Sequence, residues 1–534
     1  MAELQSIFQD RNPRQRLALS VLSGILLALV FPKFNLNWLC WFALLPLFFV
    51  LLQPISLKSA LGYTTLSGVV FYAILLYWVM QVIHQYGEQS WPIAALVWLV
   101  LVAYNALFFA VFGFLARKLL IQNYFLGSML RPSVIQISVL NSLVVAALWV
   151  AVEFARTYFL TGFPWCLLGY GLVKQLGIMQ VATVTGIYGI SFLICLVNLL
   201  LAHALYQKKQ PLFFGAAILL GLVLTGDFGF HAWLVQHPFE YVPETTQLPA
   251  SVHRVAILQL NIPQDTDWGP TTLDAWVSKL DEMIQHSQAE LIVMPENPAP
   301  FYLPDDPRFT RELRFATQQA GATVVAGVIM GHKTQSGNAG VFNSAATLDP
   351  SGRLTSEYDK RHLVPFGEYI PWRNVVSWAG KLTQEVSDFS PGENYTLSLI
   401  NQNRAAVMIC YEAIFPHLVR QFTRRGAEVL INITNDGWYG FSAAPYQHFE
   451  MARVRAIENR RYLIRAANTG ISAIVDPYGR VLDQTALGQQ SILRGVYEYR
   501  TDMTIYARFG DVFAWICVLL SIVFLAWGFA KRIR

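Results

Sequence analysis

Charged side chains are scarce in this chain: Asp, Glu, Lys and Arg make up only 14% of its 534 residues, whereas 54% of the residues are hydrophobic. The mean hydropathy of +0.40 excludes a wholly water-soluble protein. The net charge of +5 comes from basic residues in short connections between apolar runs, and no basic patch is present. A nucleic-acid partner is therefore not expected.

Cysteine is also rare. The five cysteines are odd in number and lack the paired spacing that is typical of zinc sites. The sequence therefore indicates neither a disulfide framework nor a metal centre, and it gives no reason to expect a cofactor. Cys40, Cys195 and Cys517 lie in apolar runs and are expected to be small buried side chains.

Long apolar runs, by contrast, are abundant, and a membrane span needs roughly 20 such residues. Seven candidate spans lie before residue 235 and an eighth near the C-terminus, at 17–31, 38–52, 61–83, 92–115, 135–154, 179–206, 212–230 and 512–530. The first two are short and could instead form a re-entrant hairpin. Because every even connection is basic and the odd ones carry little positive charge, the positive-inside rule predicts that both termini are cytoplasmic.

Between the last two candidate spans, short strand patterns rich in Val, Ile and Ala alternate with helical patterns. This alternation predicts one α/β domain layered as an α-β-β-α sandwich. Seven preceding crossings would place it outside the cytoplasm. The expected organisation is a bundle of seven transmembrane helices, a linker, the α/β domain and a last transmembrane helix, at 1–235, 236–253, 254–505 and 506–534.

Three reactive side chains follow predicted strands. Glu296 comes after an apolar run at 291–294, Lys360 follows Tyr358-Asp359, and Cys410 ends the run at 405–409. A cysteine that a strand end holds rigidly can act as a nucleophile when a base and a cation lie close to it. The sequence therefore predicts an acyl-transfer site made of Glu, Lys and Cys.

The segments around these residues resemble the three signature motifs of the nitrilase superfamily. They are Pro295-Glu296, the block at 358–369 and Cys410-Tyr411-Glu412. Together with the predicted spans and the motifs at 161–165 and 435–440, they resemble the apolipoprotein N-acyltransferase family over essentially the whole chain. One departure is Asn297-Pro298, where the family more often has a small hydroxyl or alanine pair, and it leaves the shape of the acyl pocket open.

This resemblance implies transfer of a fatty acyl chain from a membrane phospholipid to the free α-amino group of the diacylglyceryl-cysteine of an apolipoprotein, which is the last step of bacterial lipoprotein maturation. Cys410 would carry the chain as a thioester in ping-pong chemistry. Glu296 would act as the base, and Lys360 would stabilise each oxyanion together with the Tyr411 N–H. The family also implies a monomeric protein of the bacterial inner membrane whose catalytic domain is periplasmic.

The resemblance further implies a set of supporting residues, which are Glu368, Tyr411, Glu412, Trp268 and Asn343. Glu368 is expected to position Lys360, and Trp268 to form a wall for lipid or acceptor. An alternative for Glu368 and Glu412 is ion-paired scaffolding, in which an arginine from 453–461 holds Glu412.

Several aromatic side chains are candidates for lid or lipid contacts: Trp165, Trp372, Trp378, Trp438 and Tyr439. The insertion at 366–392 is either a helix packed on its own domain or an interfacial helix that dips into the headgroups. The loop at 435–440 is either a mobile lid or a rigid turn. Glu153 and Arg156, three residues apart in an apolar run, are expected to pair with each other or to contact a phospholipid headgroup.

The residues alone, without the family resemblance, leave two other functions open. A membrane-anchored amidase would let water resolve the thioester, but one span would suffice to anchor it. A transporter with an extracytoplasmic cap would need polar residues that face one another in several spans, and the sequence has few of them.

Overall fold

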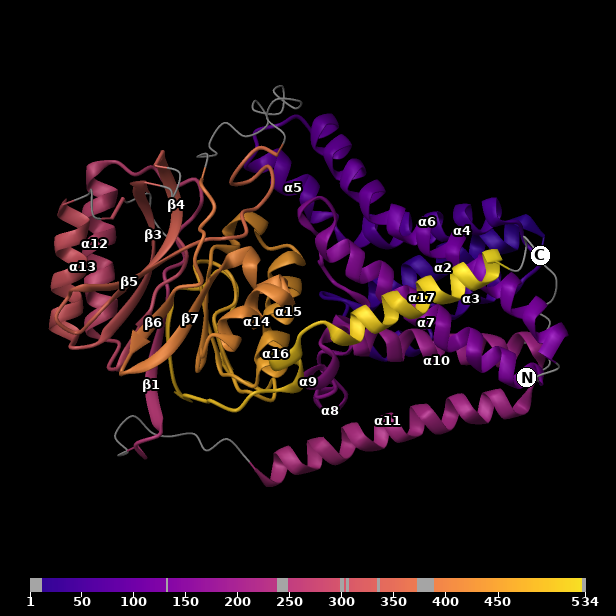
Figure 1. The fold of residues 1–534 in the computed structure, drawn as a ribbon. Coiled ribbons are helices and arrows are strands. Elements are labelled where there is room, and N and C mark those ends of the chain that lie inside the picture. Colours follow the sequence, from indigo (N-terminus) through magenta and orange to yellow (C-terminus); the bar gives the residue numbers. More distant parts are fainter. Residues whose placement is uncertain are drawn as a thin grey trace. The chain divides into compact units, whose positions relative to one another are not determined.

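The computed structural model describes residues 12–130, 133–237, 248–297, 302–303, 307–333, 337–371 and 389–530, without the side chains of 122–130 and 528–530. The chain divides into two compact units (Figure 1). The first holds Met1–Gln81, Ser90–His237 and Phe509–Arg534, and the second holds Val82–Gln89 and Pro238–Arg508.

The first unit is helical. Its helices are α2 (Pro13–Val30), η1 (Asn37–Trp41), α3 (Leu45–Leu52), α4 (Leu57–Leu75), α6 (Trp91–Leu130), α7 (Val134–Tyr158), η2 (Phe159–Thr161), η3 (Leu168–Leu172), α8 (Leu176–Met179), α9 (Ala182–Thr185), α10 (Ile187–Gln207), α11 (Gln210–Gln236) and α17 (Val512–Ala530). Polar N-caps set several starts, because the side chains of Asn12, Ser56 and Ser133 accept hydrogen bonds from the first turns of α2, α4 and α7. The helix α5 (Trp78–Gln85) crosses the boundary between the units.

Five described helical segments are long and apolar enough to cross a membrane, and α4 with α5 form a sixth candidate that is bent by 52°. The predicted spans at 38–52 and 512–530 correspond to shorter apolar helices, and the predicted span at 179–206 starts late. Gly186, with a φ of +64°, separates α9 from α10, so the continuous helix begins only at Ile187. The predicted count of eight spans therefore stays a prediction.

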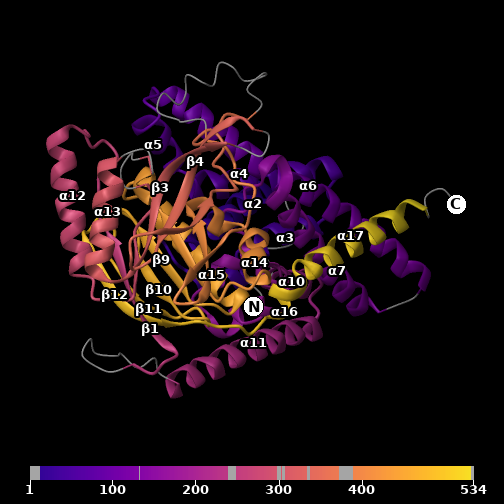
Figure 2. The same cartoon turned by 60° about the vertical axis from the view of Figure 1, so that its left-hand side comes forward.

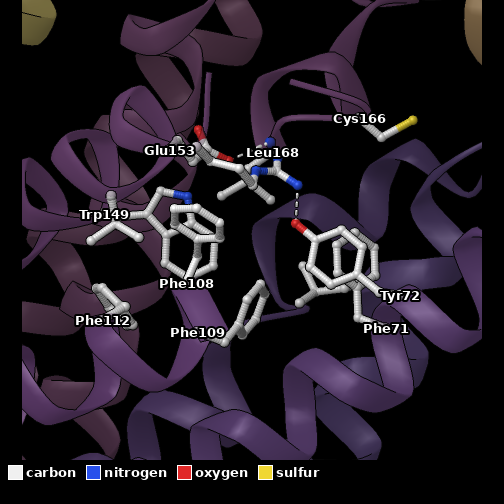
Figure 3. Close-up of a pocket in the computed structure, with 12 residues that line it drawn as sticks. Phe71, Tyr72, Phe108, Phe109, Phe112, Trp149, Glu153, Cys166 and Leu168 are labelled. Atoms are coloured by element: carbon white, nitrogen blue, oxygen red, sulfur yellow. Dashed lines mark hydrogen bonds between the residues drawn. The ribbon is translucent and has the colours of Figure 1, made fainter. Parts of the chain in front are cut away.

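Glu153 and Arg156 of α7 take separate partners. Arg156 donates to the Tyr72 hydroxyl and to Asn105 Oδ1, the latter at 3.3 Å, whereas Glu153 Oε1 accepts from the Leu168 N–H at 2.7 Å. The expected ion pair between Glu153 and Arg156 is not formed among the described residues. Both side chains line a pocket whose other walls are mostly aromatic (Figure 3).

The described strands of the second unit form two six-stranded sheets. The first runs in the order β12 (Ser491–Glu498), β1 (Val252–Gln259), β2 (Leu291–Val293), β3 (Thr323–Lys333), β4 (Ala339–Leu348) and β5 (Leu354–Asp359). The second runs in the order β11 (Val481–Gln484), β10 (Ala473–Val475), β9 (Leu463–Ala467), β8 (Val429–Thr434), β7 (Asn403–Ile409) and β6 (Leu397–Ile400).

Helices cover the outer faces of both sheets. In both ribbon views, α12 (Pro270–Gln285) and α13 (Pro307–Ala320) lie outside the first sheet, and α14 (Pro416–Arg424) and α15 (Ala444–Asn459) lie on the second (Figures 1 and 2). A short helix, α16 (Ile505–Phe509), follows the last strand. On α12 the buried positions are Trp276, Leu280, Met283 and Ile284, a helical spacing that presents one apolar face to the core. Each such fully buried aliphatic side chain contributes about 1.5–3 kcal/mol.

The parallel strands place the reactive residues at neighbouring ends. β1, β2 and β3 pair in parallel, and so do β7, β8 and β9. Ile409 pairs with Ile433 in this register, so the residues after β7 and β8 leave the sheet side by side. Glu296 follows β2, Lys360 follows β5 and Cys410 follows β7.

Candidate active site

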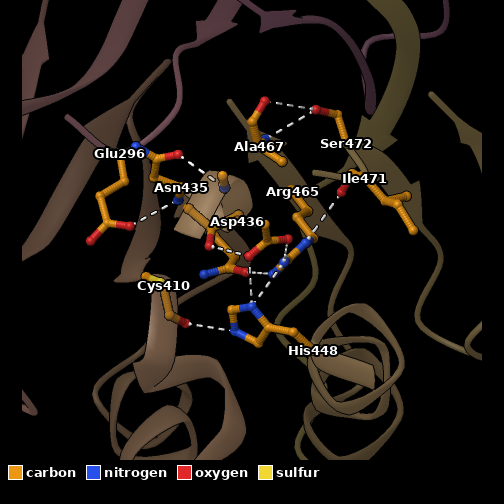
Figure 4. Close-up of polar contacts among 12 residues, drawn as sticks. Glu296, Cys410, Asn435, Asp436, His448, Arg465, Ala467, Ile471 and Ser472 are labelled. Carbon is orange, nitrogen blue, oxygen red and sulfur yellow. Dashed lines mark hydrogen bonds and ion pairs between the residues drawn. The ribbon is translucent and has the colours of Figure 1, made fainter. Parts of the chain in front are cut away.

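Hydrogen bonds on both oxygens hold the Glu296 carboxylate. Its Oε1 accepts from Lys360 Nζ at 3.1 Å and from Asn343 Nδ2 at 2.8 Å. Its Oε2 accepts from the Asn435 backbone N–H at 2.9 Å (Figure 4). Glu296 is only 5% exposed. Charge-assisted bonds of this kind fix both the position and the orientation of the carboxylate. Asn343, which the family resemblance implied as a supporting residue, therefore lies against the predicted base.

Lys360 lies between two carboxylates. Its Nζ is 2.7 Å from Glu368 Oε1 as well as 3.1 Å from Glu296 Oε1, and its side chain is 1% exposed. Burial lowers the pKa of Lys360, but Glu296 and Glu368 raise it, so that the pKa lies well above the ordinary value of 10.5. Glu368 Oε2 in turn accepts from the Val364 N–H at 2.8 Å. The ammonium is thus charged and held between the two carboxylates, and the role of Glu368 in positioning it for catalysis stays a prediction.

Cys410 begins the short helix η5 (Cys410–Ile414) directly after β7 and has a φ of +51°. This left-handed conformation is strained for a residue with a Cβ and turns the side chain sharply away from the strand. Burial and Glu296 raise the pKa of the Cys410 thiol, while Lys360 and a hydrogen bond with Thr434 lower it, and the net shift is upward. The sulfur lies on the side of Glu296 (Figure 4), so the geometry offers this protonated thiol a base. Tyr411, whose N–H is the predicted oxyanion donor, is the next residue.

Glu412 joins two strand ends. Its Oε1 accepts from the Tyr358 hydroxyl at 2.7 Å and from the backbone N–H groups of Arg361 at 2.8 Å and His362 at 3.2 Å. Its Oε2 accepts from the Ile409 N–H at 2.8 Å. The fully buried carboxylate therefore ties the segment after β5 to the end of β7.

The alternative in which an arginine from 453–461 holds Glu412 is wrong for the described residues. Arg455 of α15 forms an ion pair with Glu458 at 3.2 Å, and Arg453 forms one with Glu450 at 3.1 Å. Both are pairs three residues apart on one helix, which is the arrangement expected from spacing alone. Glu412 is therefore held by hydrogen bonds rather than by an ion pair with one of these arginines, and its supporting role in catalysis stays a prediction.

The loop after β8 forms the short helix η6 (Asp436–Tyr439), which carries Trp438 and Tyr439. Tyr86 donates to the Gly437 carbonyl at 3.0 Å, and its ring lies 5.4 Å from that of Trp438, which is 41% exposed. The Tyr439 ring lies 6.2 Å from that of His448. These contacts support the rigid turn, and the mobile lid stays a prediction.

The other predicted aromatic contacts are placed as follows. Trp268 packs edge to face against Trp276, with the ring centroids 6.0 Å apart, at the border of the core of the second unit. Trp165 is 1% exposed and lies among other aromatic rings of the first unit. Trp372 and Trp378 lie outside the described residues, as do residues 372–388 of the insertion at 366–392, so both interpretations of that insertion stay predictions. Lipid or acceptor contact at these four positions stays a prediction.

A buried polar network on the other side of Cys410 was not anticipated from the sequence. Asp436 Oδ1 lies 2.9 Å from His448 Nδ1, Asp436 Oδ2 accepts from Arg465 Nη2 at 2.8 Å, and His448 Nε2 lies 3.2 Å from the Cys410 carbonyl oxygen (Figure 4). The side chains of Asp436, His448 and Arg465 are all 0% exposed. The sequence did contain one indication of this network. Arg465 lies in the middle of the apolar strand β9, and a charged side chain in such a position needs a buried partner.

Within the described chain, one group of side chains could share a metal ion: His332, Glu357 and Asp359, whose ligand atoms lie within 4.8 Å of one another. His332 Nε2 is 3.0 Å from Glu357 Oε1 and 3.1 Å from Asp359 Oδ2. These partly exposed side chains satisfy one another as ion pairs.

Comparison with known proteins covers both units. A family model described as carbon-nitrogen hydrolase matches residues 254–494, and another described as apolipoprotein N-acyltransferase N-terminal domain matches residues 23–200. An apolipoprotein N-acyltransferase of Geobacter metallireducens is 36% identical, over 98% of this chain and 97% of that protein. The chain belongs to the apolipoprotein N-acyltransferase family. A second relative of that name, from Methylococcus capsulatus, is 34% identical over 97% of this chain and 96% of its own length.

Membership in this family confirms the predicted resemblance and the predicted class of enzyme, an acyltransferase with a nitrilase-like domain. Among solved structures, Saccharomyces cerevisiae Nit3, a member of branch 10 of the nitrilase superfamily, matches 47% of this chain and 92% of its own chain with 20% identity and a TM-score of 0.37.

Proposed function

We propose that this protein transfers a fatty acyl chain from a membrane phospholipid to the α-amino group of the N-terminal diacylglyceryl-cysteine of apolipoproteins. The observation that carries the proposal is the buried pair of Glu296 and Lys360, whose charges both act on the thiol of Cys410. Family membership and the several apolar helices long enough to cross a membrane support a lipid acyl donor and a lipid-borne acceptor.

The first half of the reaction forms a thioester. Glu296 takes the thiol proton while the Cys410 sulfur attacks the carbonyl carbon of the phospholipid ester. The charge that develops on the carbonyl oxygen is stabilised by the Lys360 ammonium and the Tyr411 N–H, and losing one such donor typically costs about 10²–10³ in rate. The ester C–O bond then breaks, and the lysophospholipid leaves as an alcohol with the proton from Glu296.

The second half consumes the thioester. Glu296 takes one proton from the acceptor ammonium, and the resulting amine attacks the thioester carbon. The same two donors, Lys360 and the Tyr411 N–H, stabilise the second oxyanion. The C–S bond breaks, the sulfur of Cys410 recovers a proton from the attacking nitrogen, and the proton first taken by Glu296 is released to water. The products are an amide-linked acyl chain and the free thiol.

The proposal includes a place in the cell. Eight membrane spans are placed in residues 1–235 and 506–534, a linker at 236–253 and the catalytic domain at 254–505; residues 238–247 of the linker lie outside the described residues. Both termini face the cytoplasm, and the catalytic domain of this monomeric inner-membrane protein lies in the periplasm. The alternation of basic and weakly charged connections supports this orientation.

Mass spectrometry of the protein purified from bacterial membranes tests the proposal. We expect a fatty acyl mass on the peptide that contains Cys410, which neutral hydroxylamine removes because it cleaves thioesters. Adding a diacylglyceryl-cysteine peptide should discharge the mass and produce an N-acylated peptide. The variant Cys410→Ser should carry no acyl thioester, and Glu296→Gln should accumulate it far more slowly.

The outcomes separate the competing functions. Loss of the acyl mass to water at the same rate with and without the amine would indicate an amidase. Absence of the mass in the wild-type protein, together with normal lipoprotein maturation by Cys410→Ser, would refute acyl transfer through this thiol.

A further inference from the structure

The carbonyl oxygen and the sulfur of Cys410 point to opposite sides of the chain (Figure 4). The sulfur lies toward Glu296, and the carbonyl oxygen lies 3.2 Å from His448 Nε2. This carbonyl belongs to the same peptide unit as the Tyr411 N–H, and in a trans peptide the C=O and the N–H point in opposite directions. A hydrogen bond on the carbonyl therefore also sets the direction of the Tyr411 N–H.

His448 must be the donor in this contact, because a carbonyl oxygen only accepts hydrogen bonds. A bond accepted at the carbonyl polarises the amide and strengthens its N–H as a donor. It also compensates part of the cost of the left-handed conformation of Cys410, whose φ is +51°. One bond thus affects the direction, the strength and the stability of the peptide unit.

Buried charges fix the His448 ring. Its Nδ1 lies 2.9 Å from Asp436 Oδ1 and 3.2 Å from Arg465 Nη2, and Asp436 and Arg465 pair at 2.8 Å. Burial raises the pKa of Asp436, but Arg465 and His448 lower it to about 2, so Asp436 is ionised at every physiological pH. Burial and Arg465 lower the pKa of His448, so the neutral ring carries its one proton on Nε2, and Nδ1 accepts from Arg465 Nη2. Because the ring is 0% exposed and is held at both nitrogens in this way, it cannot turn away from the peptide without breaking this network.

We propose that His448 is a positioning residue for acyl transfer, which holds the peptide between Cys410 and Tyr411 so that the Tyr411 N–H is aimed at the developing oxyanion. This inference rests on the proposed function. It assigns to the buried network of Asp436, His448 and Arg465 the support of one oxyanion donor, whereas Glu368 and Asn343 support the other side of the site through Lys360 and Glu296.

Two reactions of the same thiol distinguish this role from a general structural one. Acylation of Cys410 by an ester passes through an oxyanion, whereas alkylation by iodoacetamide is a direct displacement at a saturated carbon and forms none. The matched variants are His448→Asn, whose amide reaches the position of Nδ1 but not that of Nε2, and His448→Gln, whose amide reaches the position of Nε2. His286→Asn, an exposed histidine of the same unit, is the control.

We expect His448→Asn to slow acylation from phosphatidylethanolamine in mixed micelles by about 10²–10³ while alkylation keeps the wild-type rate. His448→Gln should recover most of the acylation, and His286→Asn should change neither reaction. The volume-matched variant His448→Leu, which has no donor, should repeat the selective loss and replaces His448→Asn if that variant does not fold. The acyl-enzyme is followed by mass spectrometry of the Cys410 peptide, and folding by thermal unfolding.

Wild-type acylation in His448→Asn and His448→Leu would overturn the inference, and so would an equal loss of acylation and alkylation. Both results leave the proposed function intact, because they require a wild-type protein that forms the thioester. A wild-type protein that forms no thioester would overturn the proposed function and this inference with it.

Discussion

The carboxylate of Glu412 offers the sharpest test of how the site is held together. Replacing it with glutamine keeps the shape of the side chain and removes one acceptor. The amide oxygen is best placed at the position of Oε1, where it keeps the bonds from Tyr358, Arg361 and His362. The amide NH₂ then faces the Ile409 N–H at the 2.8 Å distance of the lost hydrogen bond. Two hydrogen-bond donors thus face each other in a fully buried position, and neither has an acceptor in this contact.

The cost follows from the number of bonds. A hydrogen bond to a charged group contributes about 1.5–3 kcal/mol, and the bond with Ile409 is lost outright. The three remaining hydrogen bonds then go to a neutral amide oxygen instead of a carboxylate and are roughly half as strong. Because the variant no longer buries a charge, part of this loss is offset, and we expect a net destabilisation of about 2–4 kcal/mol.

Thermal unfolding in detergent micelles should record this loss as a fall of roughly 5–15 °C in the melting temperature. Because Ile409 directly precedes Cys410, the proposed nucleophile, acylation should slow as well. A loss of about 1.4 kcal/mol in the stabilisation of the transition state already makes the reaction tenfold slower. The control is Glu393→Gln, an exposed carboxylate of the same unit. If Glu412→Gln melts and reacts like this control, the assignment of Glu412 as the link between the two strand ends is wrong.

Three further predictions concern buried charges. Lys360→Met removes the cation between Glu296 and Glu368, so acylation, measured as the rate at which the acyl mass appears on the Cys410 peptide, should fall by about 10²–10³ or more. A wild-type acylation rate in Lys360→Met would contradict the predicted role of this cation. Asp436→Asn leaves the buried Arg465 without the carboxylate of its ion pair and should lower the unfolding free energy by about 3–5 kcal/mol, measured by thermal unfolding beside the surface control Glu393→Gln. Burial raises the pKa of Asp436, but Arg465 and His448 lower it to about 2, so the Asp436 carboxylate contributes fully to stability above the ordinary pKa of 3.8 and loses that contribution as the pH falls toward 2. Acid unfolding of Asp436→Asn should lack this pH-dependent loss, and acid transitions that are identical in Asp436→Asn and the wild-type protein would contradict the assignment.

The contact between Glu296 and Lys360 could be predicted from the sequence because each residue follows a strand and lies in a recognisable motif. The roles of these two residues and of Cys410 as base, cation and nucleophile stay predictions. Parallel strands bring such positions to one edge of a sheet, and the contacts of Glu296 with Lys360 and Asn343 arise in this way. The bonds of Glu412 could not be foreseen, since a buried carboxylate is satisfied as well by four donors as by one arginine. Spacing along the chain does not distinguish the two arrangements.

The sequence could not predict the buried network of Asp436, His448 and Arg465 or the exact starts of the helices, because both depend on tertiary packing and backbone conformation. His448 lies on a helix and Arg465 on a strand, and only the packing of α15 against the second sheet brings both to Asp436. In the helical unit, hydropathy locates apolar runs but not their breaks. Gly186 interrupts one predicted span because its positive φ ends α9. A hydropathy average over about 20 residues does not change enough at one glycine to locate this break.

The resting state of the nucleophile explains why the site needs so much support. Burial raises the pKa of the Cys410 thiol, and because thiolates are the species that oxidants attack, this protects a cysteine whose domain is predicted to lie outside the cytoplasm. The same burial makes the thiol a poor nucleophile until its proton is removed. In the proposed mechanism, Glu296 therefore acts only when an ester lies against oxyanion donors that are already in place. A rigid Lys360 and a rigid Tyr411 N–H satisfy that condition, and the buried bonds of Glu368, Glu412 and His448 are the physical source of that rigidity.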